Sequence, residues 1–161
     1  MPAIPLDQTN PAEPIRTAVW NDAPELLEMI RLLSEFHGDT PRADLHQLRL
    51  DLFGSPAWAT ALVAPKNERL LGYALLVRRY TAHFGMRGME LDHLFVRAEA
   101  RGRGLGRALV AAASATARSA GCGVLTVGTH PDNRRAQEFY PGLGFQTASA
   151  PGPRFRLQLN E

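Results

Sequence analysis

Apolar and polar positions alternate along the chain with two periods, one typical of helices and one typical of strands. Helical spacing is clearest after a candidate cap at Asn21 or Asp22, where Pro24 suits the first turn of a helix. The apolar face of this helix consists of Leu26, Leu27, Ile30, Leu33 and Phe36. A second helix is expected to begin at Thr40-Pro41 and to end at Gly54.

The rest of the chain is expected to alternate strands with two further helices. Strands are predicted over residues 15–20, 58–64, 70–80, 89–96, 123–127 and 155–159, and helices over residues 104–118 and 133–143. A polar turn at 66–68 and the glycines at 85 and 88 are typical of hairpin connections. This order predicts an α/β fold with a mixed sheet and helices on both of its faces.

The composition suits one globular domain, because 161 residues are too few for two domains of ordinary size. Residues 1–14 hold four prolines and little apolar material, so we expect a flexible tail there and a folded domain over residues 15–161. Cys122 is the single cysteine, which excludes an internal disulfide. No apolar run approaches the roughly 18 residues of a membrane span, and the chain begins without a signal-peptide pattern. We therefore expect it in the cytoplasm.

The distribution of charge argues against a nucleic-acid partner. The chain carries 18 lysines and arginines and 16 acidic residues, which give a net charge of +2. A nucleic-acid-binding domain would need basic residues gathered on one face, and here the two signs are mixed. We expect neither nucleic acid nor a membrane as a partner. The histidines show no metal-ligand spacing, so no metal is expected either.

The stretch from Leu94 to Val110 carries most of the chemical information. An apolar strand is followed by a glycine-dense turn that opens an alanine-rich helix. The start of a helix offers unpaired backbone N–H groups and partial positive charge, and a phosphate satisfies both. Glycines at 102, 104 and 106 let a phosphate approach the backbone, and arginines at 101, 103 and 107 add charged donors. The pattern predicts a pyrophosphate site; the alternative is a helix start that binds nothing.

Two nucleotide-binding patterns fail on spacing. A dinucleotide fold needs G-x-G-x-x-G after the first strand, whereas this loop reads G-x-G-x-G and comes late in the chain. A P-loop needs a lysine that is missing here, since Lys66 is the only lysine of the chain.

Two sequence motifs follow one another along the second half of the chain. Arg101-x-x-Gly104-x-Gly106 follows a strand, and the later run from Asn133 to Phe145 reads N-x-x-A-x-x-F-Y-x-x-x-G-F. Together they resemble the motifs of the GNAT superfamily of N-acetyltransferases, over residues 15 to about 160. The resemblance implies a mostly antiparallel sheet that is splayed at its centre, with acetyl-CoA as cosubstrate. More narrowly, the diamine and thialysine acetyltransferase branch is similar in segments 51–54, 62–64, 72–74 and 91–96.

The resemblance implies catalytic roles for three residues. Tyr140 matches the general acid that protonates the departing thiolate, although it could instead be a packed core aromatic, and Pro141 follows it where relatives carry a polar residue. Glu90 and Asp92 match positions of a base or of a water-ordering residue. Being two apart on a strand, they are expected to share a face, with His93 packed on the opposite one. Two other roles stay open for this pair: an acidic patch that only attracts a cationic substrate, or an ion pair with an arginine.

Cofactor contacts are implied for a larger set. Backbone N–H groups of the strand before the loop would hold the thioester carbonyl, the loop would hold the diphosphate, and the later helix would contact the pantetheine arm and adenosine side. Asn133 could instead be only a helix cap. In chain order the residues are Leu94, Phe95, Val96, Arg101, Gly102, Arg103, Gly104, Leu105, Gly106, Arg107, Asn133, Ala136 and Tyr140.

The function that the resemblance implies is acetyl transfer from acetyl-CoA to a primary amine of a small, polyamine- or amino-acid-like molecule, by direct attack in a ternary complex. A protein N-terminus or lysine as acceptor stays open, as does a non-catalytic acyl-CoA-binding sensor. Relatives often dimerise, so a homodimer is a further open point.

Overall fold

The computed structural model describes residues 14–149 and 152–159. The tail expected over residues 1–14 thus lies, except for Pro14, outside the described residues. The chain divides into two compact units, Met1–Gly128 and Thr129–Glu161, which we describe separately.

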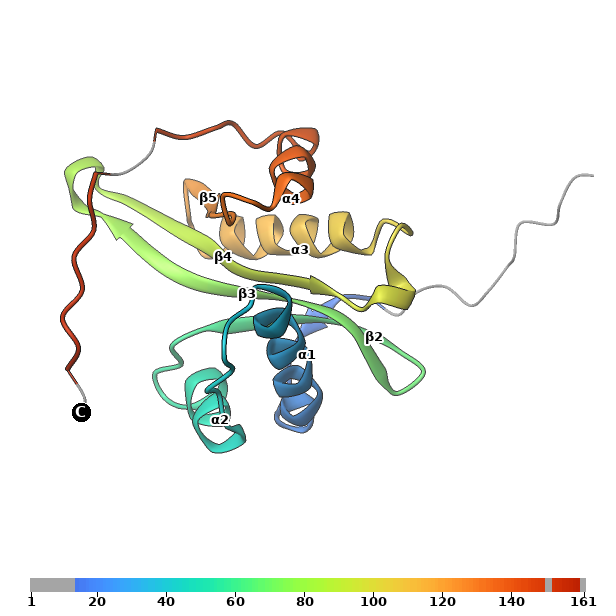
Figure 1. The fold of residues 1–161 in the computed structure, drawn as a ribbon. Helices are drawn as coiled ribbons and strands as arrows, with labels where there is room; N and C mark the ends of the chain where they lie inside the picture. The colour runs from blue at the N-terminus through green and yellow to red at the C-terminus, as the bar shows by residue number, and fades with distance from the viewer. Residues whose placement is uncertain (1–13, 150–151, 160–161) are drawn as a thin grey trace, which may run out of the picture. The chain divides into compact units, whose positions relative to one another are not determined.

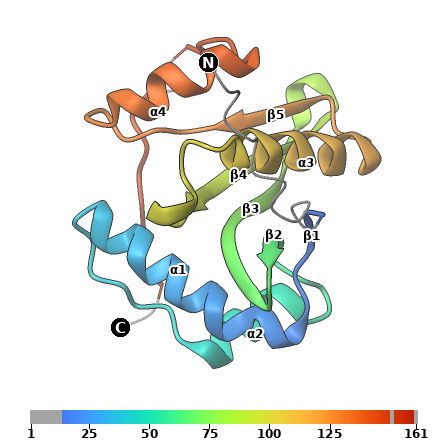
Figure 2. The same ribbon diagram turned by 90° about the vertical axis from the view of Figure 1, so that its right-hand side faces the viewer.

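The first unit is built on a five-stranded sheet with the order β1-β2-β3-β4-β5 (Figures 1 and 2). β1 to β4 pair antiparallel, and β5 pairs parallel to β4, so the mixed and mostly antiparallel sheet is confirmed. The strands are β1 (Arg16–Thr17), β2 (Thr60–Lys66), β3 (Arg69–Thr81), β4 (Met86–Val96) and β5 (Val124–Val127). β1 is shorter than predicted because Trp20–Asp22 form a 3-10 turn.

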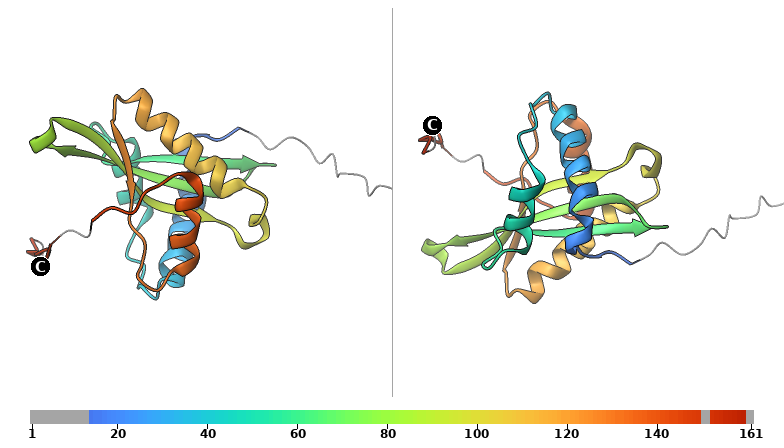
Figure 3. Two further views of the ribbon diagram at one scale, coloured as in Figure 1. Left: turned by 90° about the horizontal axis from the view of Figure 1, so that it is seen from above. Right: turned by 90° about the horizontal axis from the view of Figure 1, so that it is seen from below.

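Helices cover both faces of this sheet, as predicted. α1 (Ala23–Phe36) and α2 (Leu45–Phe53) lie on one face, and α3 (Leu105–Ser119) lies on the other (Figure 3). The expected start of the second helix at Thr40-Pro41 was wrong, because the side chain of Asp44 caps the helix by accepting a hydrogen bond from Gln47 N at 2.9 Å. None of the helices among the described residues is long and apolar enough to cross a bilayer.

The main core lies between α1 and the sheet. Its fully buried members include Leu26 and Met29 of α1, Val63 of β2 and Tyr73 of β3. On the other face α3 approaches the sheet closely at Gly72, where an added Cβ would lie 3.2 Å from Leu109 Cδ1 and 2.6 Å from the backbone oxygen of Phe95. Both helical layers are therefore fixed against the same central strands, β3 and β4.

A β-bulge interrupts β4 at Asp92. Leu76 pairs with Leu91 and Leu75 pairs with His93, so Asp92 is an extra residue without a partner on β3. The pairing of β5 with β4 also ends at Leu91. Beyond this point β4 continues next to β3 alone among the described strands, which is the splayed sheet that was expected.

The second unit contains α4 (Arg134–Phe139), followed by a 3-10 turn at Pro141–Leu143. The helix predicted over residues 133–143 is divided there because Pro141 has no N–H to continue the ladder. The strand predicted over residues 155–159 was wrong: these residues pair with no strand in the described part of the chain. Alternating apolar residues form a strand only against a neighbour, and Phe155 is 95% exposed.

Candidate active site

The glycine–arginine loop runs from the end of β4 to the start of α3. A 3-10 turn at Ala98–Ala100 leads into it, and Gly104 stands at the N-cap of α3. Gly102 and Gly104 have φ angles of 74° and 81°, in the left-handed region that favours glycine. At these two residues the backbone turns sharply as it enters α3.

The glycine-rich end of this loop offers backbone N–H groups that no described residue accepts from. Within residues 14–149 and 152–159, none is found for the backbone N–H groups from Gly102 to Gly106, whereas Ala108 N already donates to Gly104 O at 3.0 Å. Arg101, Arg103 and Arg107 are exposed around them. Arg101 is held in place because its Nε donates to Val96 O at 2.8 Å. Unpaired donors at a helix start, surrounded by guanidinium groups, form a site suited to a diphosphate.

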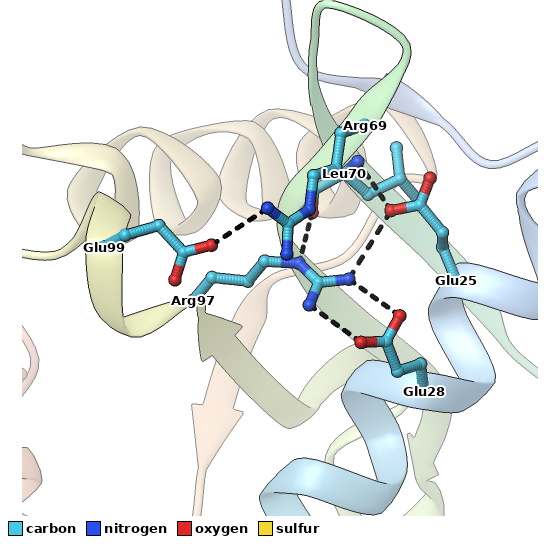
Figure 4. Close-up of polar contacts among 6 residues, drawn as sticks. All are labelled: Glu25, Glu28, Arg69, Leu70, Arg97 and Glu99. Carbon is cyan, nitrogen blue, oxygen red and sulfur yellow. Dashed lines mark hydrogen bonds and ion pairs between the residues drawn. The ribbon is translucent and has the colours of Figure 1, made fainter.

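Arg97 fixes the point where the loop leaves the sheet (Figure 4). Its side chain is only 5% exposed, and its Nε donates to Leu70 O at 2.7 Å. Its two terminal nitrogens contact both carboxylate oxygens of Glu28 at 3.1 Å, and one lies 3.5 Å from Glu25. Glu25 in turn accepts a hydrogen bond from Leu70 N at 2.9 Å. This network joins α1, β3 and the end of β4.

Sequence reasoning missed Arg97. The available signal was an arginine at the end of an apolar strand, with Glu25 and Glu28 at i,i+3 spacing on an amphipathic helix. The hydrogen bonds that Arg97 donates to Glu28 hold the pKa of Glu28 below its ordinary value and raise the pKa of Arg97. Both shifts favour the charged pair.

Glu90 is neutralised by a neighbour. It forms an ion pair with Arg79 of β3, and Thr126 of β5 donates a 3.3 Å hydrogen bond to the same carboxylate oxygen. Of the interpretations left open from the sequence, the arginine bridge is the one observed for this residue.

Asp92 and His93 do not follow the strict alternation that the sequence suggested. Because Asp92 is an extra residue, His93 lies on the face of Tyr73 and Phe95, so its expected placement opposite to Glu90 was wrong. Tyr73 Oη lies 3.1 Å from His93 Nδ1, and Asp92 Oδ2 lies 3.8 Å from His93 Nε2. Burial lowers the pKa of His93, while the charge of Asp92 acts in the opposite direction.

Beside the loop, β4 offers a free edge. Leu94, Phe95 and Val96 pair with β3, and β5 ends its pairing before them at Leu91. Along these residues the edge of β4 that faces away from β3 has no strand partner in the described part of the chain. Backbone groups on such an edge are able to bind an extended ligand.

The remaining candidates belong to the second unit. Tyr140 is buried, with its ring 5.1 Å from Phe139 and 5.4 Å from Phe145 between centroids, and burial raises its pKa to about 12. Its hydroxyl keeps its proton at neutral pH and hydrogen-bonds to no described residue. Asn133 caps α4, because its Oδ1 accepts a hydrogen bond from Ala136 N at 3.1 Å. The structure thus shows the capping role that the sequence offered for Asn133 as the alternative to a cosubstrate contact.

A search among the described residues finds no group of three His, Cys, Asp or Glu side chains that could hold a metal ion.

Comparison with known proteins identifies the chain. The sequence pattern of the acetyltransferase (GNAT) family matches residues 17–145, which is most of the length. The chain belongs to the GNAT family. A thialysine N-epsilon-acetyltransferase of Bos taurus is 30% identical over 142 residues, which cover 82% of this chain and 83% of the relative. The uncharacterized N-acetyltransferase YhfO of Bacillus subtilis (strain 168) is 28% identical over 82% of this chain and 89% of its own length.

A solved GNAT-like structure agrees with the fold. The putative acetyltransferase from Arthrobacter sp. FB24 superposes with a TM-score of 0.71 at 27% identity, covering 96% of this chain and 99% of the other. As a GNAT protein, the chain is an acetyl-CoA-dependent N-acetyltransferase. The loop fits this cosubstrate, since acetyl-CoA carries a diphosphate and no described residue accepts a hydrogen bond from the backbone N–H groups of Gly102 to Gly106.

The Arg97 network leads to a stability prediction. Arg97→Met keeps most of the side chain's apolar length but leaves Leu70 O and two carboxylates without their donor. We expect the free energy of unfolding to fall by about 1–3 kcal/mol in urea denaturation at pH 7. Arg31→Met, on the exposed side of α1, is the matched control and should change it little.

The same network makes the stability loss of Arg97→Met depend on pH. The pKa of Glu28 is lowered in the folded state, so its pairing stabilises the protein above the ordinary carboxylate pKa and is lost as the pH falls. The difference between wild type and Arg97→Met should therefore shrink in acid. A difference that stays constant from pH 7 to pH 3 would contradict the ion-pair explanation.

Proposed function

We propose that the protein transfers the acetyl group of acetyl-CoA to a primary amine of a small molecule, by direct attack in a ternary complex. The observation that carries the proposal is the row of N–H groups from Gly102 to Gly106, at the start of α3, for which the described part of the chain offers no acceptor. In the proposal these backbone N–H groups, that of Leu105 among them, hold the diphosphate. The side chains of the arginines at 101, 103 and 107 add charged donors. Asn133 and Ala136 contribute further contacts to the cosubstrate.

The acceptor class is inferred from relatives and from charge. Three mammalian relatives named thialysine N-epsilon-acetyltransferase match over about four fifths of this chain at 28–30% identity. Their name specifies a side-chain amine of a small molecule. In this chain Asp92 is exposed at the β4 bulge, and a carboxylate there would attract a protonated amine before it reacts.

In the proposed acetyl transfer, each of the candidate residues has one role. A protonated amine has no lone pair, so one proton must leave before attack; Asp92, or a water bound to it, accepts that proton. Glu90 is the less suitable base because Arg79 neutralises it. Backbone N–H groups of residues 94–96 polarise the thioester carbonyl. As the new N–C bond forms and the C–S bond breaks, Tyr140 donates its proton to the sulfur, and the second proton that leaves the nitrogen restores the phenol through water.

Release of free CoA thiol tests this function. Purified protein is mixed with acetyl-CoA and a panel of amines: thialysine and lysine, polyamines, aminoglycosides, and peptides with free N-termini. We expect thiol release with a small primary amine and none with its N-acetylated form. Preference for peptides would favour a protein acceptor instead. Binding of acetyl-CoA without turnover of any acceptor would favour an acyl-CoA-binding sensor.

Acetyl-CoA should raise the melting temperature in a dose-dependent way, because a ligand that binds only the folded state stabilises it. Gly106→Val should abolish most of this shift by placing a branched side chain in the loop. Gly106 lies in the first turn of α3 and has no positive φ, so the change adds bulk without the backbone strain expected at Gly104.

The control for this variant is Ala111→Val, which introduces the same side chain at an exposed position of the same helix. It should leave the acetyl-CoA shift intact. Equal shifts with acetyl-CoA, NAD and ATP, or an undiminished shift in Gly106→Val, would contradict the assignment of the loop.

Tyr140→Phe tests the general acid. Phenylalanine keeps the ring contacts with Phe139 and Phe145 and removes only the hydroxyl. We expect kcat to fall roughly 10²- to 10⁴-fold, with acetyl-CoA affinity and melting temperature nearly unchanged. The measurement is steady-state thiol release at saturating amine.

Two other outcomes of Tyr140→Phe would contradict the acid role. A rate and a stability that are both unchanged would make Tyr140 a packing residue. A loss of about 1 kcal/mol or more in stability at constant kcat would make its hydroxyl a structural hydrogen-bond donor.

A further inference from the structure

The β4 bulge places one carboxylate in an unusual position. Asp92 is the extra residue, and it directly follows Leu91, where the pairing with β5 ends. Its side chain is 51% exposed, and its nearest charged or titratable contact is His93. Glu90, two residues earlier, is already paired with Arg79. At the point where β4 and β5 separate, Asp92 is therefore the carboxylate that no arginine neutralises among the described residues.

Tyr73 determines which nitrogen of His93 carries the proton. Tyr73 is fully buried, and the one hydrogen-bond partner of its hydroxyl within the described chain is His93 Nδ1, at 3.1 Å. If Nδ1 carried a proton and donated, the phenolic proton would be buried without an acceptor, which is costly. Tyr73 therefore donates, Nδ1 accepts, and the neutral ring carries its hydrogen on Nε2.

The Nε2 atom lies on the side of Asp92. The separation from Oδ2 is 3.8 Å, which is longer than a hydrogen bond, so a direct bond requires the exposed carboxylate to turn toward the ring. The arrangement is thus a chain from a buried phenol through an imidazole to an exposed carboxylate.

We propose that Tyr73 and His93 are positioning residues for Asp92: Tyr73 fixes the tautomer of His93, and the Nε2–H of His93 orients one oxygen of Asp92 so that the other faces the acceptor amine. This inference rests on the proposed function, because it assigns Asp92 the task of receiving the amine. Neither Tyr73 nor His93 touches the reacting atoms. Both act through the carboxylate.

The arrangement works only while His93 is neutral. The titratable groups that act on its ring are Tyr73 from β3, Asp92 from β4 and His37, the residue that follows α1. Burial, the largest effect, and His37 lower the pKa of His93, while Asp92 raises it. Below that pKa the imidazolium would pair with Asp92 and compete with the amine. Activity should therefore be lost as the pH falls through the pKa of His93.

Variants of His93 separate positioning from packing. The amide nitrogen of glutamine reaches about as far as Nε2, whereas leucine fills space without a donor. We expect His93→Leu to lower kcat/KM roughly 10- to 100-fold, and His93→Gln to recover most of that loss. His46→Gln, at an exposed position of α2, is the control and should behave as wild type.

Tyr73→Phe provides the pH readout. It preserves the buried ring and removes the hydroxyl that opposes protonation of Nδ1. The acid limb of the kcat/KM profile should move to higher pH, while the acetyl-CoA-induced rise in melting temperature stays as in wild type. An acid limb at the wild-type position, or equal kcat/KM for His93→Leu and wild type, would overturn the inference.

Ring ¹⁵N NMR of the full-length protein tests the tautomer without any turnover. His93 should be the Nε2–H form at pH 7 in wild type and should titrate at higher pH in Tyr73→Phe. Nδ1–H in wild type would overturn the inference even in an active enzyme. The expected tautomer in a protein that acetylates no amine would overturn the proposed function and, with it, the role of Asp92.

Discussion

The buried guanidinium group of Arg97 links α1 and β3 at the point where β4 leads into the glycine–arginine loop. A buried charge is costly unless it is paired and hydrogen-bonded, and here it meets a backbone oxygen of β3 and two carboxylates of α1. Those partners lie on the helix that covers one face of the sheet and on the strand next to β4. Because Arg97 is the residue after β4, its position also sets where the chain enters the glycine–arginine loop.

The loop needs such a fixed start. Gly102 and Gly104 have little intrinsic preference for one backbone conformation, and flexible residues do not by themselves direct N–H groups to one point. Arg97 anchors one side of the loop and α3, packed on the sheet near Gly72, anchors the other. A rigid frame around a glycine-rich turn lets backbone donors converge without reorganisation when an anion binds.

Local patterns in the sequence predicted local structure well. The alanine-rich helix was expected to begin at Gly104 because glycine density marks a helix start, and α3 begins at Leu105. The division of the last helix at Tyr140 was also available from the sequence, since Pro141 cannot continue the ladder. The strand expected over residues 155–159 failed because alternation of apolar residues says nothing about whether a neighbouring strand is present.

Features that depend on distant residues were missed. The partners of Arg97 on α1 are 69 and 72 positions away, and no local pattern names them. The bulge at Asp92 depends on how β3 pairs with β4, so a strict two-residue period wrongly placed His93. Glu90 and Asp92 look equivalent in the sequence, yet Arg79 neutralises only the first. The glycine-rich start of α3 could thus be predicted from the sequence, whereas the ion pair of Glu90 and the bulge at Asp92 could not.

The bulge also bears on how such a protein diverges. A single deletion at residue 92 would restore regular pairing between β3 and β4 while Leu91 and His93 kept their present partners, so the exposed carboxylate alone would be lost. The glycine–arginine loop, fixed by Arg97 downstream, would keep its geometry. One extra residue in a strand therefore separates two parts of the molecule: a glycine–arginine loop that Arg97 fixes, and an exposed carboxylate that an insertion or deletion can add or remove without a change in the core.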